Sequence, residues 1–219
     1  MTSSAYTQVL YAACGVLVLA GIGVVWRREL SALLRLLALQ GAALALIAAV
    51  QAAHGRSVEL AVVAIVVAVV KAVVLPRVLR RVLARDDQPR EATPLVNVAA
   101  SLLAAGMFTL AAYAAARPLV DLNPTPAGRA APAALAVVLI AFFTLVTRRR
   151  ALSQIVAVLM IDNGIAALAF LIAAGVPLIV DLGVTADVLL AVLVLQVLTA
   201  RMHTHLGGTD LDDLRELRD

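Results

Sequence analysis

The sequence is short of the residues that hold metal centres. Cys14 is the only cysteine in 219 residues, and the histidines are His54, His203 and His205. One cysteine excludes an internal disulfide, and this set is too small for an iron–sulfur cluster or a structural zinc site. His54 is predicted at one membrane face and the other two histidines at the opposite face, which also excludes a haem held between them. We therefore expect this chain to bind no metal or cofactor of its own.

Charged and aromatic residues are also scarce. Only 15% of the residues are charged and 4% aromatic, whereas 63% are hydrophobic, and the mean hydropathy is +1.00. Runs of about 20 apolar residues, the length that crosses a bilayer, recur along the chain and predict a polytopic membrane protein. Motifs of nucleotide-binding, hydrolytic and metalloprotease sites are absent, so we expect no catalysis by this chain. The net charge of +4 lies in short loops between apolar runs and does not suggest nucleic-acid binding.

Seven membrane-spanning helices are predicted. Backbone polar groups in lipid must bond internally, and the apolar runs lack the period-two alternation of barrel strands, so the expected fold is all-α. The first run lacks the basic region and cleavage pattern of a secretory signal, and we keep it as a helix. The spans are expected at 4–26, 31–53, 58–79, 94–116, 130–147, 151–175 and 178–200.

The arginines predict the orientation of these helices. Three arginines, Arg56, Arg117 and Arg129, lie on one side, with the proline-rich loop 117–129, and fourteen lie on the other. Because basic loops stay in the cytoplasm, the N-terminus is expected outside and the C-terminus inside. The fourteen cytoplasmic arginines are Arg27, Arg28, Arg35, Arg77, Arg80, Arg81, Arg85, Arg90, Arg148, Arg149, Arg150, Arg201, Arg215 and Arg218.

The two ends of the chain resemble each other. A shift of 122 residues places the Arg-Arg-x-Leu-Ser pattern at 27–31 on the one at 149–153, and Gln40 on Asp162. The pattern predicts a parallel 3+1+3 repeat, an arrangement known in membrane transport proteins, although chance similarity between sequences rich in Ala, Val and Leu is the alternative. The expected units are an N-terminal three-helix unit at 1–83, a linker, fourth helix and outer loop at 84–129, a C-terminal three-helix unit at 130–205 and a cytoplasmic tail at 206–219.

Two acids in predicted spans are the first candidates for function. Asp162 lies near the middle of the span 151–175, where a carboxylate costs roughly 3 kcal/mol, so such residues usually face a protein interior and handle ions or protons. Asp187 lies about eight residues into the last span. The alternative for Asp162 is a structural acid satisfied by Asn163, Gln154 or a neighbouring subunit. The alternative for Asp187 is contact with water at the headgroups.

Lys71, the only lysine, lies inside the span 58–79. It either snorkels toward Arg77, about 9 Å along the helix, or stays buried and pairs with an acid. Lysine can release a proton in a relay and arginine cannot, so Lys71 joins Asp162 and Asp187 as a proton-path candidate. The polar residues expected to support these candidates between helices are Asn163, Gln40, Gln154 and Gln196.

The C-terminal part of the chain resembles a known family. The Arg-Arg-x-Leu stretch at 149–152, followed by L-x-I-D-N, A-L-A-F and a last helix with Asp187 and LVLQVLTAR, resembles the K-type small membrane subunit of respiratory complex I and the C-type subunit of Mrp cation/proton antiporters. That family carries a buried acid on the second and third helices of a three-helix unit. Asp162 and Asp187 take about these positions, as aspartate rather than glutamate. In length and over the whole chain, the sequence looks more like the hydrogenase-4 component E family.

This resemblance implies a non-catalytic membrane subunit of an energy-converting hydrogenase or a formate hydrogenlyase-type complex, in a bacterial or archaeal cytoplasmic membrane. Such a subunit contributes buried charges to proton or sodium translocation coupled to electron transfer. The implied partners are large antiporter-like membrane subunits and a cytoplasmic hydrogenase-like arm, which holds the nickel–iron and iron–sulfur centres. The alternatives are a structural scaffold with no ion path, an Mrp-type antiporter subunit and a self-contained transporter of small solutes, for which the chain offers few polar groups.

Overall fold

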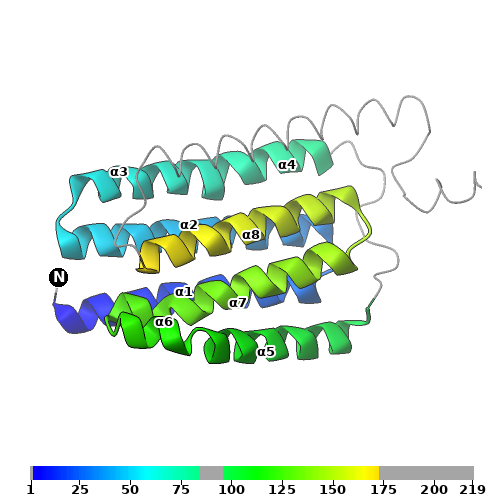
Figure 1. Ribbon diagram of the computed structural model, residues 1–219. Helices are drawn as coiled ribbons and strands as arrows, with labels where there is room; N and C mark the ends of the chain where they lie inside the picture. The colour runs from blue at the N-terminus through cyan, green and yellow to red at the C-terminus, as the bar shows by residue number, and fades with distance from the viewer. Residues whose placement is uncertain (1, 84–95, 173–219) are drawn as a thin grey trace, which may run out of the picture.

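The computed structural model describes residues 2–83 and 96–172, and all the regular elements of these ranges are helices (Figure 1). Six helical segments in this part are long and apolar enough to cross a membrane. The prediction of an all-helical fold is therefore confirmed for the described residues, and these six helices are consistent with a polytopic membrane protein. The elements are α1 (Ser3–Trp26), α2 (Leu30–Gly55), α3 (Val58–Val67), the π-helix η1 (Ala68–Val74), α4 (Leu75–Leu83), α5 (Val98–Ala115), α6 (Arg117–Leu122), α7 (Pro126–Thr147) and α8 (Ala151–Ile172).

The predicted outer loop at 117–129 is wrong in part, because α6 and the start of α7 lie within it. Pro118 and Pro126 occupy the first turns of these helices, where a missing N–H breaks no intrahelical bond. Thr125 caps α7 by accepting a hydrogen bond from the Gly128 N–H at 3.1 Å. The seventh predicted span, the loop 84–93 and the tail 206–219 lie outside the described residues.

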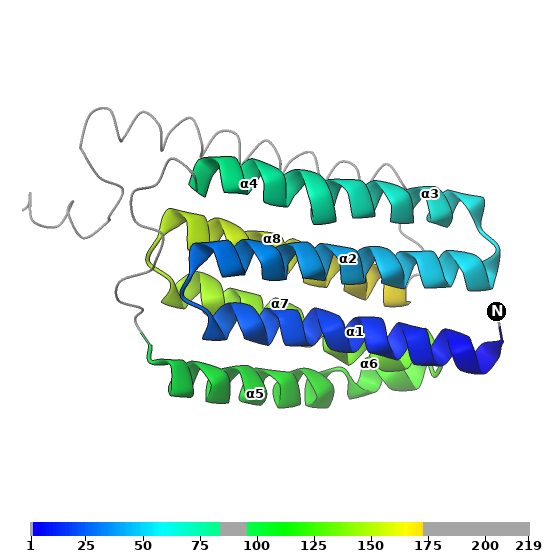
Figure 2. The same ribbon diagram turned by 180° about the vertical axis from the view of Figure 1, so that it is seen from behind.

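Four helices form the centre of the bundle. Helices α1 and α2 pack side by side in one layer and α7 and α8 in the other, with α1 on α7 and α2 on α8 (Figures 1 and 2). Helix α5 flanks α1 and α7 at one edge, and the continuous helix α3–η1–α4 flanks α2 at the other. Buried leucine, isoleucine, valine and alanine side chains fill the space between the layers.

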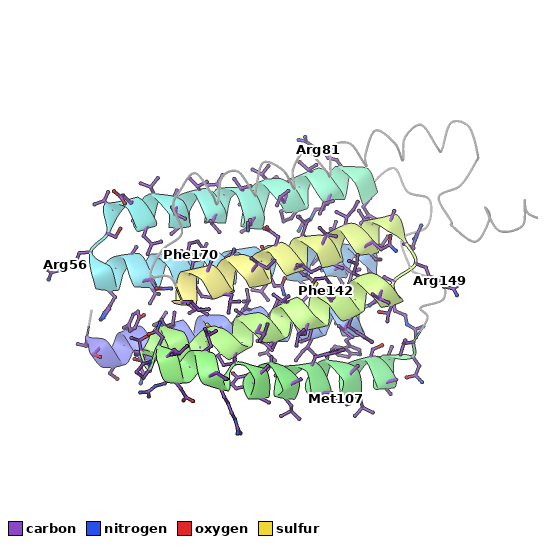
Figure 3. All side chains as sticks on the ribbon, viewed as in Figure 1. Arg56, Arg81, Met107, Phe142, Arg149 and Phe170 are labelled. Atoms are coloured by element: carbon purple, nitrogen blue, oxygen red, sulfur yellow. The ribbon has the colours of Figure 1, made fainter. Side chains whose placement is uncertain are left out.

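The two ends of the bundle differ in charge. We call one the arginine-poor end, which carries Arg56, Arg117 and Arg129, and the other the arginine-rich end, where α1, α4 and α7 finish. Figure 3 shows Arg56 at the first end and Arg81 and Arg149 at the second. This segregation follows the predicted alternation of loops along the chain. The bundle thus has the unequal distribution of arginine between its two ends from which the positive-inside rule assigns the cytoplasmic side.

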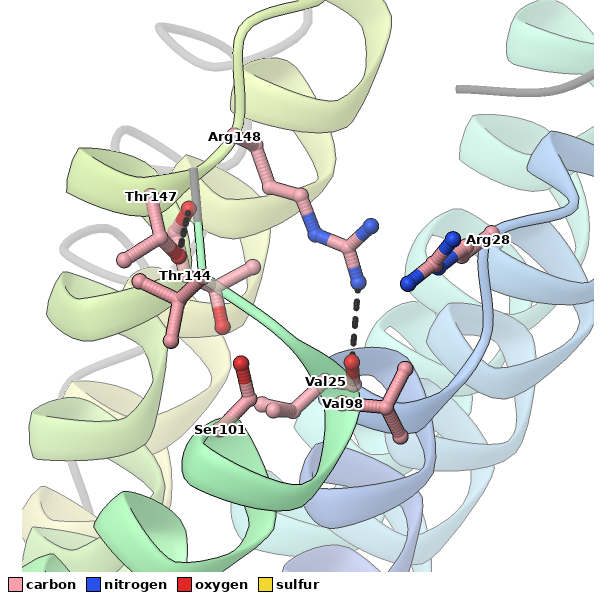
Figure 4. A pocket seen from close by; sticks show the side chains of 8 residues that line it. Val25, Arg28, Val98, Ser101, Thr144, Thr147 and Arg148 are labelled. Carbon is pink, nitrogen blue, oxygen red and sulfur yellow. Dashed lines mark hydrogen bonds between the residues drawn. The ribbon is translucent and has the colours of Figure 1, made fainter. Parts of the chain in front are cut away.

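Arg148 ties the arginine-rich ends of α7 and α1 together. Its guanidinium is buried, and Nη2 donates a hydrogen bond to the Val25 carbonyl oxygen at 3.0 Å, which Figure 4 shows. The carbonyl oxygens of Val24 and Arg27 also accept from Nη2, each at 2.9 Å. These carbonyls lie at the C-terminal end of α1, where intrahelical donors run out. Beside the guanidinium, Arg28 and hydroxyl side chains line a cavity of about 10 Å³, room for one water molecule. The sequence predicted Arg148 only as a cytoplasmic loop residue.

Replacing Arg148 by glutamine is expected to lower the free energy of unfolding by about 2–3 kcal/mol, because carbonyls at the end of α1 lose a charged donor in a buried place. Thermal unfolding of the purified protein in detergent measures the change. Arg35→Gln, which removes an exposed guanidinium from α2, is the matched control and should shift the unfolding temperature little. Equal shifts in the two variants would contradict the capping role.

Candidate functional site

An ion pair lies inside the bundle between two candidates from the sequence. Lys71 Nζ on η1 is 2.8 Å from Asp162 Oδ2 on α8, and the two side chains are 2% and 10% exposed. Of the two alternatives for Lys71, the structure therefore has the buried lysine paired with an acid, and snorkelling toward Arg77 is not observed. Asp162 is satisfied by Lys71 rather than by Gln154. The attraction between the charges offsets part of the cost of burying each of them.

The ion pair is incomplete as a set of hydrogen bonds. Among the described residues, Lys71 Nζ has no acceptor in hydrogen-bonding geometry, although the Asp162 carboxylate lies within contact distance. An ammonium group has three N–H donors, and a buried donor left without an acceptor costs free energy. Lys71 is thus held by charge and remains able to bond to a water molecule or to a second acceptor.

Lys71 is placed by an irregular turn and by a glycine on the neighbouring helix. It lies in the π-helix η1, and such turns often occur at functional positions. The backbone of Lys71 lies against Gly41 on α2, where an added Cβ would be 2.6 Å from the Lys71 carbonyl carbon and 2.7 Å from its oxygen. Only glycine permits this approach, which brings the start of the lysine side chain close to α2.

Amide side chains continue the polar contacts from α8 into the other layer. Asn163 Nδ2 donates to Gln40 Oε1 at 3.5 Å, and Gln40 Nε2 donates to the Leu17 carbonyl oxygen at 3.3 Å. Gln40 is fully buried and Asn163 nearly so. We call Leu17, Gln40, Lys71, Asp162 and Asn163 the polar layer. It joins α1, α2, η1 and α8.

The polar layer lies near the middle of the bundle. Nine to twelve residues separate Leu17, Gln40, Lys71 and Asp162 from the arginine-rich ends of their helices. At 1.5 Å per residue this is about 15 Å, half the thickness of a bilayer's hydrocarbon core. The four residues come from four helices and still lie at one level, so the layer coincides with the membrane midplane if the helices span it.

A second polar region opens at the arginine-poor end. A cavity of about 460 Å³ is lined by residues that include Gln51, Asn123 and the stacked rings of Tyr6 and His54, whose centroids are 4.1 Å apart. Gln51 Nε2 also donates to the Phe170 carbonyl oxygen at 2.7 Å and so joins α2 to α8. Gln51 follows Gln40 by three helical turns and lies on the same face of α2. This cavity and the polar layer therefore both lie along the contact between α2 and α8, which we call the α2–α8 seam.

Buried apolar residues separate the cavity from the polar layer. On α2, Leu44, Ile47 and Ala48 lie between Gln40 and Gln51 and are fully buried. On α8, Ala167 takes the corresponding place and is also fully buried. Water and ions would cross this stretch only if the seam between α2 and α8 opened.

Not every predicted site residue joins the polar layer. Gln154 instead donates from Nε2 to the Arg148 carbonyl oxygen at 3.1 Å and steadies the turn between α7 and α8. Asp187 and Gln196 lie outside the described residues. Gly41, Arg148 and the Leu17 carbonyl were not predicted. The shift of 122 residues that places Gln40 on Asp162 also places Gly41 on Asn163, and this is a sequence signal that connects Gly41 with the site.

Comparisons with known proteins give one relative and no activity. No protein-family model matches the chain, and no solved structure matches it. A protein from Mycobacterium tuberculosis (strain ATCC 25618 / H37Rv), named Uncharacterized protein Rv0085, is 50% identical over 224 residues, which cover 100% of this chain and 100% of the relative. The likeness extends over every helix described above.

Proposed function

The chain belongs to the same family as this mycobacterial protein, and we propose that it is a non-catalytic membrane subunit that passes or gates protons at the Lys71–Asp162 pair. The parent assembly is proposed to be a complex I-like energy-converting hydrogenase or formate hydrogenlyase-type complex, as the resemblance to hydrogenase-4 component E implies. The observation that carries the proposal is the buried ion pair at mid-height in an apolar bundle. Ionisable residues at this depth are expensive and are characteristic of ion and proton paths.

The chemistry of the pair suits a relay. Both groups can exchange a proton, and each sits within the electrostatic influence of the other, so a proton arriving at Asp162 removes the charge that holds Lys71. Lys71, which has no aligned acceptor among the described residues, can then move or release its own proton. Asp162 is proposed as the proton acceptor, Lys71 as its partner, and Gln40 and Asn163 as dipoles that follow the change.

The path is proposed to run mainly within the plane of the membrane. Buried apolar side chains close the bundle on both sides of the polar layer, at Leu44 and Ile47 toward one end and at Leu34 and Leu37 toward the other. The polar contacts extend sideways instead, from η1 through α8 to α2 and α1. In an assembly with large antiporter-like neighbours, this layer would connect their buried charges laterally.

The helix arrangement supports the proposed repeat. A shift of 122 residues carries α1 onto 125–148 and the first residue of α2 onto 152, within one residue of the observed bounds of α7 and the start of α8. Equivalent helices also pack on each other across the two layers. Gln40 and Asp162 then hold equivalent positions in the polar layer, one neutral and one charged. With the arginine-rich end in the cytoplasm, the N-terminus is proposed to lie outside.

Asp162→Asn tests the proposal. In vesicles that contain the assembled complex, driven with formate or hydrogen, the variant is expected to keep electron transfer and to lose proton uptake, because an amide cannot accept the proton. Proton uptake is followed with a pH-sensitive dye, and repeating the assay with a sodium-specific ionophore distinguishes a primary sodium flux. Assembly is checked on native gels.

The matched control is Asp121→Asn, which removes an exposed carboxylate on α6 and should leave proton uptake unchanged. Undiminished uptake in Asp162→Asn would instead favour the scaffold alternative, in which the pair only orients helices. The tight apolar packing between α2 and α8 is the observation that supports the scaffold alternative.

A further inference from the structure

A groove runs along the outside of the bundle between α2 and α3. Its volume is about 740 Å³, and its walls are almost entirely apolar, mostly alanine with three larger side chains, Leu46, Val58 and Ile65. On α2 the wall is formed by Ala42, Ala49 and Ala53, and on α3 by Ala61 and Ala64. Small side chains on both facing helices leave the volume between them unfilled.

The two ends of the groove are different. At the inner end it closes where α2 and the η1 backbone meet, because an added Cβ on Gly41 would be 2.6 Å from the Lys71 carbonyl carbon. At the outer end it reaches Arg56 and Ser57 in the α2–α3 connection. The α2 wall from Ala42 to Arg56 is about 21 Å long, and the α3 wall from Ser57 to Ala68 about 16 Å. One leaflet of the hydrocarbon core is about 15 Å thick, so the groove matches the depth of a single acyl chain.

The outer end carries the charge that a lipid headgroup needs. Arg56 is exposed, adopts a left-handed conformation with φ 54° as it caps α2, and forms no ion pair with a carboxylate within the described ranges. Its guanidinium can bind a phosphate through two N–H donors. The backbone N–H groups of the first turn of α3 also lie there. Glu59 in the same turn adds a carboxylate, which suits a headgroup that carries an ammonium beside its phosphate.

We propose that this groove binds one glycerophospholipid from the leaflet at the arginine-poor end, with one acyl chain along the alanines and the phosphate on Arg56. The Glu59 carboxylate makes phosphatidylethanolamine the favoured headgroup. The end of the acyl chain would lie against Ala42 and Ala68, next to the contact between Gly41 and Lys71. The lipid would thereby hold α2 and α3 at their spacing beside the polar layer. The inference requires the bundle to span a membrane, but it does not require ion translocation.

Native mass spectrometry of the purified protein tests the site, with phosphatidylethanolamine added to the detergent. The wild type is expected to retain one bound lipid. Ala49→Leu combined with Ala61→Leu fills the groove and should abolish retention, and Arg56→Gln should reduce the bound fraction several-fold. Controls of the same chemistry are Ala111→Leu on the exposed face of α5 and Arg117→Gln, both expected to bind as the wild type does. A folded, monodisperse groove variant with undiminished retention overturns the proposal.

A photoreactive diazirine residue at Ala53 identifies the occupant in native membranes. Covalent addition of one phospholipid mass is the expected result. Attachment to another polypeptide, or to the predicted span 178–200 of this chain, would overturn the proposal, because the groove would then hold a transmembrane helix. Asp162→Asn should retain the lipid as the wild type does. The proposal of a lipid site and the proposal of a proton path can therefore be tested separately.

Discussion

A protein in which Lys71 is replaced by Met and Asp162 by Leu is expected to fold nearly as well as the wild type and to move no protons. The reason lies in the energetics of buried charge. Removing one partner of a buried ion pair costs about 3–5 kcal/mol, because the remaining charge has no compensation, whereas exchanging both for apolar residues of similar volume is often neutral or stabilising. The pair contacts at 2.8 Å and is almost completely buried, so it meets the conditions for this behaviour.

The experiment is a double-mutant cycle. Lys71→Met and Asp162→Leu are each expected to lose about 3–5 kcal/mol of unfolding free energy, unless the lone group gives up its charge, and the double variant to recover most of the loss. Unfolding in detergent measures stability, and vesicle assays measure proton uptake. A double variant as unstable as the single ones would show that the two residues do not act as a pair. A stable double variant that still takes up protons would show that the pair contributes to helix packing and not to proton transfer.

Gly41→Ala is expected to destabilise the protein and to disturb the ion pair, because the added methyl group collides with the backbone that carries Lys71. The new Cβ would lie 2.6 Å from the Lys71 carbonyl carbon and 2.9 Å from the Ala72 nitrogen, and both of these are backbone atoms that no side-chain rotation can move. Helix α2 and η1 must therefore separate, which costs about 1–3 kcal/mol by analogy with overpacked cores. Because the same backbone carries Lys71, its ammonium would move relative to Asp162, and proton uptake should fall with stability.

Gly106→Ala is the matched control. A Cβ at Gly106 on α5 meets nothing within 4 Å, and replacing a helical glycine by alanine usually stabilises by about 0.5–1 kcal/mol. The same chemical change should thus lower the unfolding temperature at one position and raise it at the other. A Gly41→Ala variant as stable as wild type, with normal proton uptake, would show that the close approach of α2 to η1 is dispensable.

Much of the architecture was predictable from local sequence. Apolar runs of spanning length and clustered arginines are local properties, and lipid permits few ways to satisfy a backbone, so the helices follow from them. The boundaries at 117–129 were harder, because proline both ends helices and begins them. Within the described residues, the interruption of the third span by η1 has no signal in a run of Ala and Val around Lys71.

The sequence by itself determined that Lys71 and Asp162 lie inside apolar spans and need compensation, because their charge and their distance from any loop are set by the order of residues. It left open whether the Lys71 side chain extends to the membrane surface or stays buried. It also did not distinguish Gln154 from Asn163 or a neighbouring subunit as the partner of Asp162. Only the tertiary structure decided that the two charges meet, that Asn163 beside Asp162 bonds to Gln40, and that Gln154 bonds to the turn between α7 and α8. Helices of Ala, Val and Leu can rotate and pair in many ways at similar cost, whereas one arrangement brings Gly41 against η1 and turns the lysine toward the acid.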